Sequence, residues 1–145
     1  RYRTVVYEHC SVQLSPLRKT SGEHLDATLN AVRKGNTALY WWIYPNLMVN
    51  IYDGVMDTNL VLPLGADRCL CVFDFYFAET GPAAVEEYIN ASIAVAHQVQ
   101  AEDIEICEEV QRNFASDSFS TGRFSVRYEE GGYHFHRLLA KALTL

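Results

Sequence analysis

The chain has 145 residues, 49% of them hydrophobic, and its 12 Lys and Arg against 18 Asp and Glu give a formal net charge of −6. This length and apolar content suffice for about one hydrophobic core, and a second domain is not expected. The acidic balance disfavours a polyanionic partner such as nucleic acid and tolerates a cationic ligand. No apolar run approaches the length of a membrane span, and the chain opens on Arg-Tyr-Arg with neither an initiator Met nor an apolar signal core, so we expect a piece of a longer protein.

The first quarter of the chain combines a strand-like stretch with a polar one. Residues 4–14 are rich in β-branched and aromatic side chains and predict one strand, which Pro16 closes. Residues 15–36 are polar and contain glycine, so we expect a loop there, with at most a short turn at residues 25–32.

Two strong strands follow, at residues 39–44 and 47–52, and turn residues end each of them. Because side chains alternate along a strand, one face carries apolar groups: Leu39, Trp41, Ile43, Val49 and Ile51. The other face carries groups with polar tips and long side chains: Tyr40, Trp42, Tyr44, Met48, Asn50 and Tyr52. This second face is the better candidate for a binding site.

A hairpin is predicted next, with strands at residues 57–64 and 68–77 and the turn Gly65-Ala66-Asp67 between them. Both faces of its second strand are largely apolar. We therefore expect a sheet that is covered on both sides.

Helical signals dominate the rest of the chain. We predict a long helix over residues 83–115, a strand over residues 123–128 and a short helix over residues 135–143, after Gly131 and Gly132. Strands followed by one long helix, without βαβ alternation, indicate an α+β fold with an antiparallel sheet.

The long helix carries one acid on its apolar side. Residues spaced three or four apart form an apolar stripe along the helix, made of Val95, Val99, Ile106, Val110 and Phe114. Asp103 lies in the middle of this stripe. An ionised carboxylate in such a stripe requires a cation, hydrogen-bond donors or a metal. Three interpretations stay open: an N-cap after a kink near Gln100, a buried ion pair, or a metal site.

The cysteines and histidines form no known metal motif. The four cysteines, Cys10, Cys69, Cys71 and Cys107, lack a C-x-x-C spacing and are interpreted as buried free thiols. The five histidines are His9, His24, His97, His134 and His136. In a continuous helix His97 lies about 120° from Asp103. His134 and His136 could chelate a metal if extended, or could make ordinary polar contacts.

Several short motifs, spread over nearly the whole chain, occur in the order found in one known family. They are Tyr44-Pro45-Asn46, Met56-Asp57-Thr58-Asn59, Leu62-Pro63-Leu64-Gly65, Gln100-x-Glu102-Asp103-x-x-x-Cys107-Glu108-x-Val110-Gln111, Gly122-Arg123 and His134-Phe135-His136. The chain resembles the C-terminal part of Rieske-type non-haem iron oxygenase α subunits. Within that family it is most similar to the choline monooxygenase-like branch, which oxidises quaternary amines.

The resemblance implies a fold and a metal. The fold is the helix-grip fold, in which a curved antiparallel sheet grips a long helix. In the family an Asp at the place of Asp103 is the carboxylate ligand of a mononuclear Fe(II), which two histidines also bind. Those histidines come from an H-x-x-x-x-H pair that this chain lacks, so Asp103 is the one metal-binding and catalytic residue assigned here.

The resemblance also implies a larger protein. Residues 1–145 are expected to be a C-terminal catalytic-domain fragment, with the two histidines and a Rieske [2Fe–2S] domain upstream, because neither C-x-H nor C-x-x-H occurs here. The implied partners are a small-molecule substrate, O₂ and a reductase or ferredoxin as electron donor, in a homotrimer of full-length α subunits. The expected location is cytoplasmic, or an organelle stroma if the protein is plant-like.

A substrate pocket is expected beside the iron. A quaternary ammonium donates no conventional hydrogen bond and is recognised by aromatic faces. The candidates are the polar-tipped sheet face and two residues of the long helix: Tyr40, Trp42, Tyr44, Met48, Asn50, Ile93 and Val99. Choline, carnitine and betaine substrates stay open, as do hydroxylation and demethylation. The alternatives are an aromatic core without a ligand, an aromatic-ring-hydroxylating dioxygenase, a metal-free structural subunit and a non-catalytic helix-grip module for an apolar ligand.

Overall fold

The computed structural model describes residues 2–17, 32–81, 83–116 and 119–144. These residues form two compact units. The first contains a β-sheet and the C-terminal helix, and the second contains a long helix together with Val32 and Arg33. His24 and most of the turn predicted at residues 25–32 lie outside the described residues.

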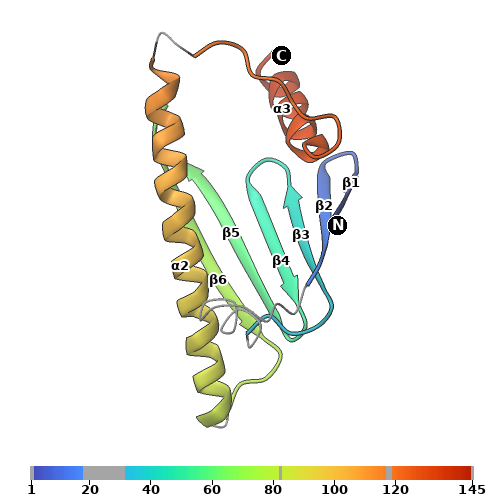
Figure 1. Cartoon of the computed structure of the whole chain (residues 1–145), viewed down its shortest axis with the longest axis vertical. Helices are drawn as coiled ribbons and strands as arrows, with labels where there is room; N and C mark the ends of the chain where they lie inside the picture. The colour runs from blue at the N-terminus through green and yellow to red at the C-terminus, as the bar shows by residue number, and fades with distance from the viewer. Residues whose placement is uncertain (1, 18–31, 82, 117–118, 145) are drawn as a thin grey trace. The chain divides into compact units, whose positions relative to one another are not determined.

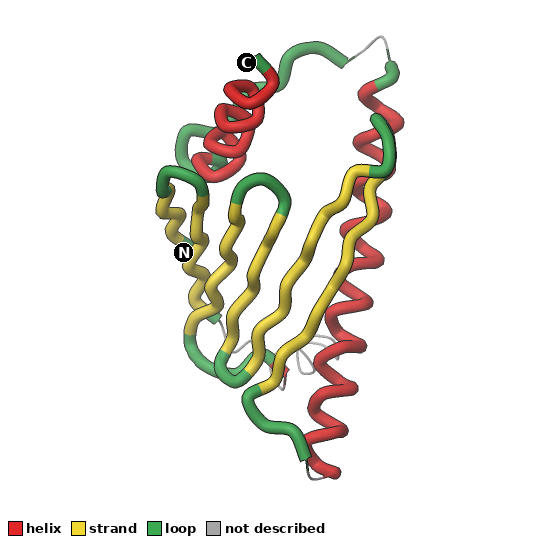
Figure 2. Tube along the Cα trace, turned by 180° about the vertical axis from the view of Figure 1, so that it is seen from behind, coloured by secondary structure: helices red, strands yellow, loops and turns green. Residues whose placement is uncertain are grey.

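A six-stranded antiparallel sheet forms most of the first unit. Each strand pairs with the next one along the chain, in the order β1 to β6, as Figures 1 and 2 show. The strands are β1 Arg3–Val6, β2 Cys10–Pro16, β3 Thr37–Ile43, β4 Leu47–Tyr52, β5 Val55–Pro63 and β6 Cys69–Phe77. The predicted antiparallel sheet is therefore confirmed.

The first predicted strand, at residues 4–14, is wrong as a single element. The structure folds it into a hairpin in which Val6 of β1 pairs with Ser11 of β2. The Tyr7 N–H donates to the Cys10 carbonyl oxygen at 2.8 Å, so a tight turn at Glu8 and His9 separates the two strands. The turn contains none of the residues Gly, Pro, Asn, Asp or Ser, which is why turn chemistry did not indicate it.

We predicted a sheet covered on both sides, but the described residues leave one face of β6 exposed. On β6, Leu70 and Tyr76 share one face and are 48% and 50% exposed. Among the cysteines, Cys69 and Cys107 are exposed, and Cys10 and Cys71 are only partly buried. The prediction that the thiols are buried is therefore wrong.

The long helix α2, Ala83–Phe114, is continuous. Its N-terminal half carries the buried Val95 and a hydrogen bond in which the Tyr88 hydroxyl donates to the Val32 carbonyl oxygen at 2.7 Å. Residues 101–116 are all exposed, including the apolar Ile106 and Phe114. No helix in the described ranges combines the length and apolar content that crossing a membrane requires.

The last part of the chain differs from the prediction at two places. Residues 123–128 form no strand, because Ser125 starts a turn: its carbonyl oxygen accepts from the Tyr128 and Glu129 N–H groups at 3.3 and 3.1 Å. The Ser125 N–H in turn donates to the Glu129 carboxylate. Helix α3, Glu130–Leu143, begins before the two glycines and not after them. The α+β class is confirmed.

The turn at Gly35 generates a stability prediction. Gly35 has a φ of +90°, and a Cβ there would lie 2.9 Å from Asp53 Cβ. We expect Gly35→Ala to destabilise the chain by about 1–3 kcal/mol, through backbone strain and a clash. Gly54→Ala adds only strain, because its φ is +78° and its surroundings are open, and Gly122→Ala adds neither. Chemical denaturation should rank the three in that order, and equal stability of Gly35→Ala and Gly122→Ala would contradict the account.

Candidate functional site

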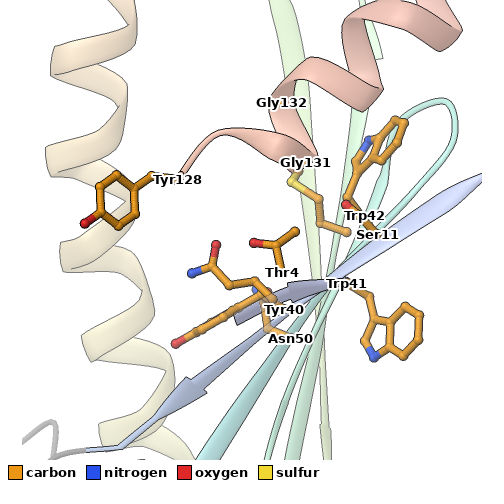
Figure 3. Close-up of a pocket in the computed structure, with 11 residues that line it drawn as sticks. Thr4, Ser11, Tyr40, Trp41, Trp42, Asn50, Tyr128, Gly131 and Gly132 are labelled. Carbon is orange, nitrogen blue, oxygen red and sulfur yellow. The ribbon is translucent and has the colours of Figure 1, made fainter. Parts of the chain in front are cut away.

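One face of the sheet carries a cavity of about 240 Å³ between β1–β4 and the start of α3. Figure 3 shows the side chains that surround it. Its lining residues all belong to the first unit: Thr4, Ser11, Gln13, Tyr40, Trp41, Trp42, Met48, Asn50, Tyr128, Gly131 and Gly132. Four predicted substrate residues, Tyr40, Trp42, Met48 and Asn50, are thus brought together at one cavity.

Strand register explains why these residues meet. Ser11 lies opposite Trp42, and Trp42 opposite Met48, in one row across three strands. Gln13, Tyr40 and Asn50 form the next row in the same way. Residues in register across an antiparallel sheet share a face, so the two rows form one wall.

The Trp42 ring is held in this wall by contacts with neighbouring rings. Its ring centroid lies 5.2 Å from that of Phe135 and 6.2 Å from that of Tyr44, both at nearly perpendicular angles. Edge-to-face contacts of this kind hold a ring in one orientation. Tyr44 therefore contacts a lining residue, although it does not itself line the cavity. Tyr40 makes a similar contact with Tyr52 at 6.0 Å.

Trp41 has a different environment. It is next to Trp42 in the sequence, so its side chain lies on the opposite face of the sheet. Its ring stacks on Tyr7 at 5.9 Å with an angle of 20° between the planes. In Figure 3 the indole of Trp41 points away from Thr4, Tyr40 and Asn50.

The start of α3 closes the other side of the cavity. A Cβ on Gly131 would lie 3.4 Å from Ser11 Oγ and 3.6 Å from Thr4 Cγ2. Glycine at this position therefore lets the helix start lie close to the β1–β2 hairpin. Tyr128 reaches the cavity from the turn before α3, and its ring also contacts Tyr2 at 6.2 Å.

A polar cluster beside the cavity was missed as a site by sequence reasoning. Asn50 Nδ2 donates to Asp57 Oδ1 at 2.7 Å and to Asn59 Oδ1 at 3.1 Å, and Asn59 Nδ2 donates to Asp57 Oδ1 at 3.0 Å. Asn59 is only 8% exposed. The available signal was the spacing of Asp57 and Asn59, two residues apart and hence on one face of a strand.

The predicted iron ligand lies in the second unit. Asp103 is exposed on α2, and the helix has no break near Gln100, so the N-cap interpretation is wrong. Among the described residues Asp103 forms no ion pair, so the buried-pair interpretation is wrong for this part of the chain too. The metal-ligand interpretation of Asp103 is the one that stays a prediction.

Two further metal ligands for Asp103 are not found within the described ranges, which hold no group of three His, Cys, Asp or Glu side chains suited to a metal. His97 is on the same continuous helix, about 120° around its axis from Asp103. Ile93 and Val99, the two remaining predicted substrate residues, are partly buried on α2. They do not line the cavity of the first unit.

His134 and His136 do not form the chelating pair considered above. Both lie in α3, where residues two apart point about 200° apart around the axis. The His134 ring contacts Trp42 at 6.0 Å, and its Nε2 is buried without a hydrogen-bond partner among the described residues. His136 contacts Phe124 at 5.0 Å. The alternative of satisfied polar contacts is therefore wrong for His134 Nε2.

Comparisons with known proteins agree on one family. Residues 11–145 match the family model described as ring hydroxylating alpha subunit (catalytic domain). The chloroplastic choline monooxygenase of Arabidopsis thaliana is 40% identical over 144 residues, which are 99% of this chain and 32% of that protein. That of Beta vulgaris is 34% identical over 142 residues, 98% of this chain and 30% of that protein.

A solved structure has the same fold. It is that of a quaternary ammonium Rieske monooxygenase studied for carnitine oxidation by gut microbiota. The match has a TM-score of 0.75 at 19% identity and covers 97% of this chain and 39% of that one. This chain spans about a third of the length of the two choline monooxygenases.

The ligand set generates a prediction about metal binding. Since the described residues offer Asp103 without two nearby imidazoles, we expect the purified chain to bind far less than one iron per molecule. Anaerobic loading with Fe(II), followed by desalting and metal analysis, is the measurement. About one iron per chain, lost in Asp103→Ala, would show that the ligands have been misjudged.

Proposed function

Because the chain belongs to the family of ring hydroxylating alpha subunits, whose catalytic domain it matches over residues 11–145, we propose that it is part of the catalytic domain of a Rieske oxygenase acting on a small quaternary amine. The proposed activity is that of the whole protein. The two related choline monooxygenases are each about three times as long as this chain. The two choline monooxygenases and the quaternary ammonium monooxygenase are the relatives that support this substrate class.

The observation that carries the proposal is the cavity on the sheet. Trp42 and Tyr40 offer aromatic side chains, and no described lining residue carries a formal charge. A trimethylammonium group has no N–H to donate, so ring faces and removal from water are its means of recognition. A cavity of about 240 Å³ suits a ligand smaller than a drug-sized molecule.

The polar lining residues have a separate task. Ser11 and Gln13 present a hydroxyl and an amide group from β2, and Asn50 presents an amide group from β4. These groups can donate to or accept from a hydroxyl on the substrate. They would therefore orient a small amino alcohol while the rings hold its cationic end.

Asp103 would hold the metal. Oxygenases of this family use a mononuclear iron and a Rieske [2Fe–2S] cluster. The iron, when bound, supplies the site at which dioxygen is activated. Asp103 contributes one carboxylate, and we propose that the two histidines and the Rieske domain belong to the part of the protein upstream of this chain.

The remaining partners follow from the reaction class. Oxygenation requires O₂ and electrons, and we propose a reductase or ferredoxin as the donor and a homotrimer of full-length subunits as the assembly. The relatives from Arabidopsis thaliana and Beta vulgaris are chloroplastic. A stromal or cytoplasmic location stays a prediction for this protein.

Truncation of Trp42 tests the substrate class. In the full-length protein, Trp42→Ala should weaken choline binding by about 0.5–2 kcal/mol, because the cation–π attraction is lost. Calorimetry should show that 3,3-dimethylbutan-1-ol, in which carbon replaces the ammonium nitrogen, binds less tightly than choline to the wild type. The mutation should reduce that preference.

Tyr76→Ala is the control, because it removes an exposed aromatic ring of β6 that does not line the cavity. It should leave the preference for the cation unchanged. If the wild type binds the neutral alcohol more tightly, the quaternary-amine assignment is wrong, and an aromatic substrate of a ring-hydroxylating dioxygenase becomes the better interpretation.

Removal of the Asp103 carboxylate tests the metal assignment. In the full-length protein, Asp103→Ala should abolish mononuclear iron binding and oxygenation and leave the visible spectrum of the Rieske cluster intact, because the two metals have separate ligands. Glu109→Ala, which removes another exposed acid of α2, should change neither property. Loss of the cluster spectrum together with the iron in Asp103→Ala would indicate a role in folding.

A further inference from the structure

Asp57 is a carboxylate on the cavity side of the sheet. It lies on β5, directly opposite Asn50 of β4, and Asn50 lines the cavity. Residues in register share a face, so Asp57 extends the row of Gln13, Tyr40 and Asn50 by one strand. With adjacent strands about 4.8 Å apart, Asp57 and Tyr40 are roughly 10 Å apart across the sheet.

Two side-chain amides hold this carboxylate in place. Asp57 Oδ1 accepts from Asn50 Nδ2 at 2.7 Å and from Asn59 Nδ2 at 3.0 Å. Asn50 Nδ2 also donates to Asn59 Oδ1 at 3.1 Å, so the three side chains form one closed cluster. An ionised carboxylate can only accept hydrogen bonds, and both amides meet it with donors.

The charge of Asp57 is not balanced by a cationic side chain in the described part of the chain. None of the described ion pairs includes it. Its neighbour on the other side, on β6, is Phe75. The described lining residues of the cavity carry no formal charge either. An anion fixed beside an uncharged aromatic cavity attracts a cation into that cavity, because the local dielectric constant is lower than in water.

We propose that Asp57 is a specificity-determining residue, which makes the cavity favour a monocationic trimethylammonium alcohol over both its neutral isostere and trimethylammonium carboxylates. This inference rests on the proposed function, since it takes the cavity as the quaternary-amine site. The carboxylate attracts the ammonium group of either amine. It repels the carboxylate of a zwitterion such as carnitine or betaine, and no Lys or Arg among the described lining residues compensates that repulsion.

Asn50 and Asn59 act as positioning residues for Asp57. Asn59 is nearly buried, and the polar atoms of its amide are paired within the cluster. The position of the carboxylate is therefore set by the strand register and by two amides, and does not depend on a mobile side chain.

The test is Asp57→Asn in the full-length protein, which removes the charge at nearly constant size. Calorimetry with choline, 3,3-dimethylbutan-1-ol and glycine betaine gives two affinity ratios, choline to neutral alcohol and choline to zwitterion. At low salt both ratios should fall about tenfold in the variant, as expected for one unit charge at roughly 8–10 Å in a partly buried site. Affinity for the neutral alcohol should stay constant.

Asp74→Asn is the matched control. Asp74 is on the neighbouring strand, opposite Thr58, so it lies on the other face of the sheet, and it is exposed. This variant should leave both ratios at their wild-type values. Asp57→Thr offers a second uncharged side chain that suits a strand, in case the amide disturbs the cluster.

The outcomes separate the inference from the proposed function. A wild type without preference for choline over the neutral alcohol would overturn the proposed function itself. A wild type that prefers choline, with unchanged ratios in folded Asp57→Asn or Asp57→Thr, would overturn the role of Asp57 alone. An equal loss of all three ligands would also overturn it, since that result indicates a structural role.

Discussion

The antiparallel register from β2 to β5 is the constraint on which the site depends. It places Trp42 between Ser11 and Met48, and Tyr40 between Gln13 and Asn50. A slip of one residue in any pair would move a whole set of side chains to the other face. Buried residues lie on both faces of the sheet, since Val12 on the opposite face is 4% exposed and Asn59 on the cavity face is 8% exposed. A slip would therefore exchange buried groups of one face for those of the other.

The cavity face combines rings with a polar cluster that ordinary core packing does not require. Buried amides and carboxylates are tolerated when each has a partner, and Asn50, Asp57 and Asn59 satisfy one another. An apolar core would be simpler, so the cluster is more readily understood as part of a binding site. The glycine start of α3 completes the site, because Gly131 allows a helix to lie close to Ser11 and Thr4.

Much of the sheet could be predicted because its signals are local. Residues 47–52 were predicted with the bounds that β4 has, since turn residues flank an apolar, β-branched run. The β1–β2 turn has neither Gly nor Pro and was missed. Residues 123–128 have strand-forming side chains, but the turn at Ser125 prevails. The cluster around Asp57 depends on the pairing of β4 with β5, which cannot be predicted from the residues of either strand alone.

Asp103 shows a second limit of sequence reasoning. Periodicity correctly placed it on one face with Ile106 and Val110, in one continuous helix. It did not indicate what covers that face, and both apolar side chains are largely exposed in the described structure. The assignment of Asp103 as an iron ligand therefore rests on the family alone, and it stays a proposal.

The central claim is that the sheet cavity binds the cationic end of a quaternary amine. A crystal structure of the full-length protein with bound choline tests it most directly. The account predicts the trimethylammonium group against the Trp42 ring, on the side of the cavity nearer Asp57, with the hydroxyl at Ser11 or Gln13 of β2. An ammonium group outside this cavity, or a cavity filled only by protein side chains, would contradict the account.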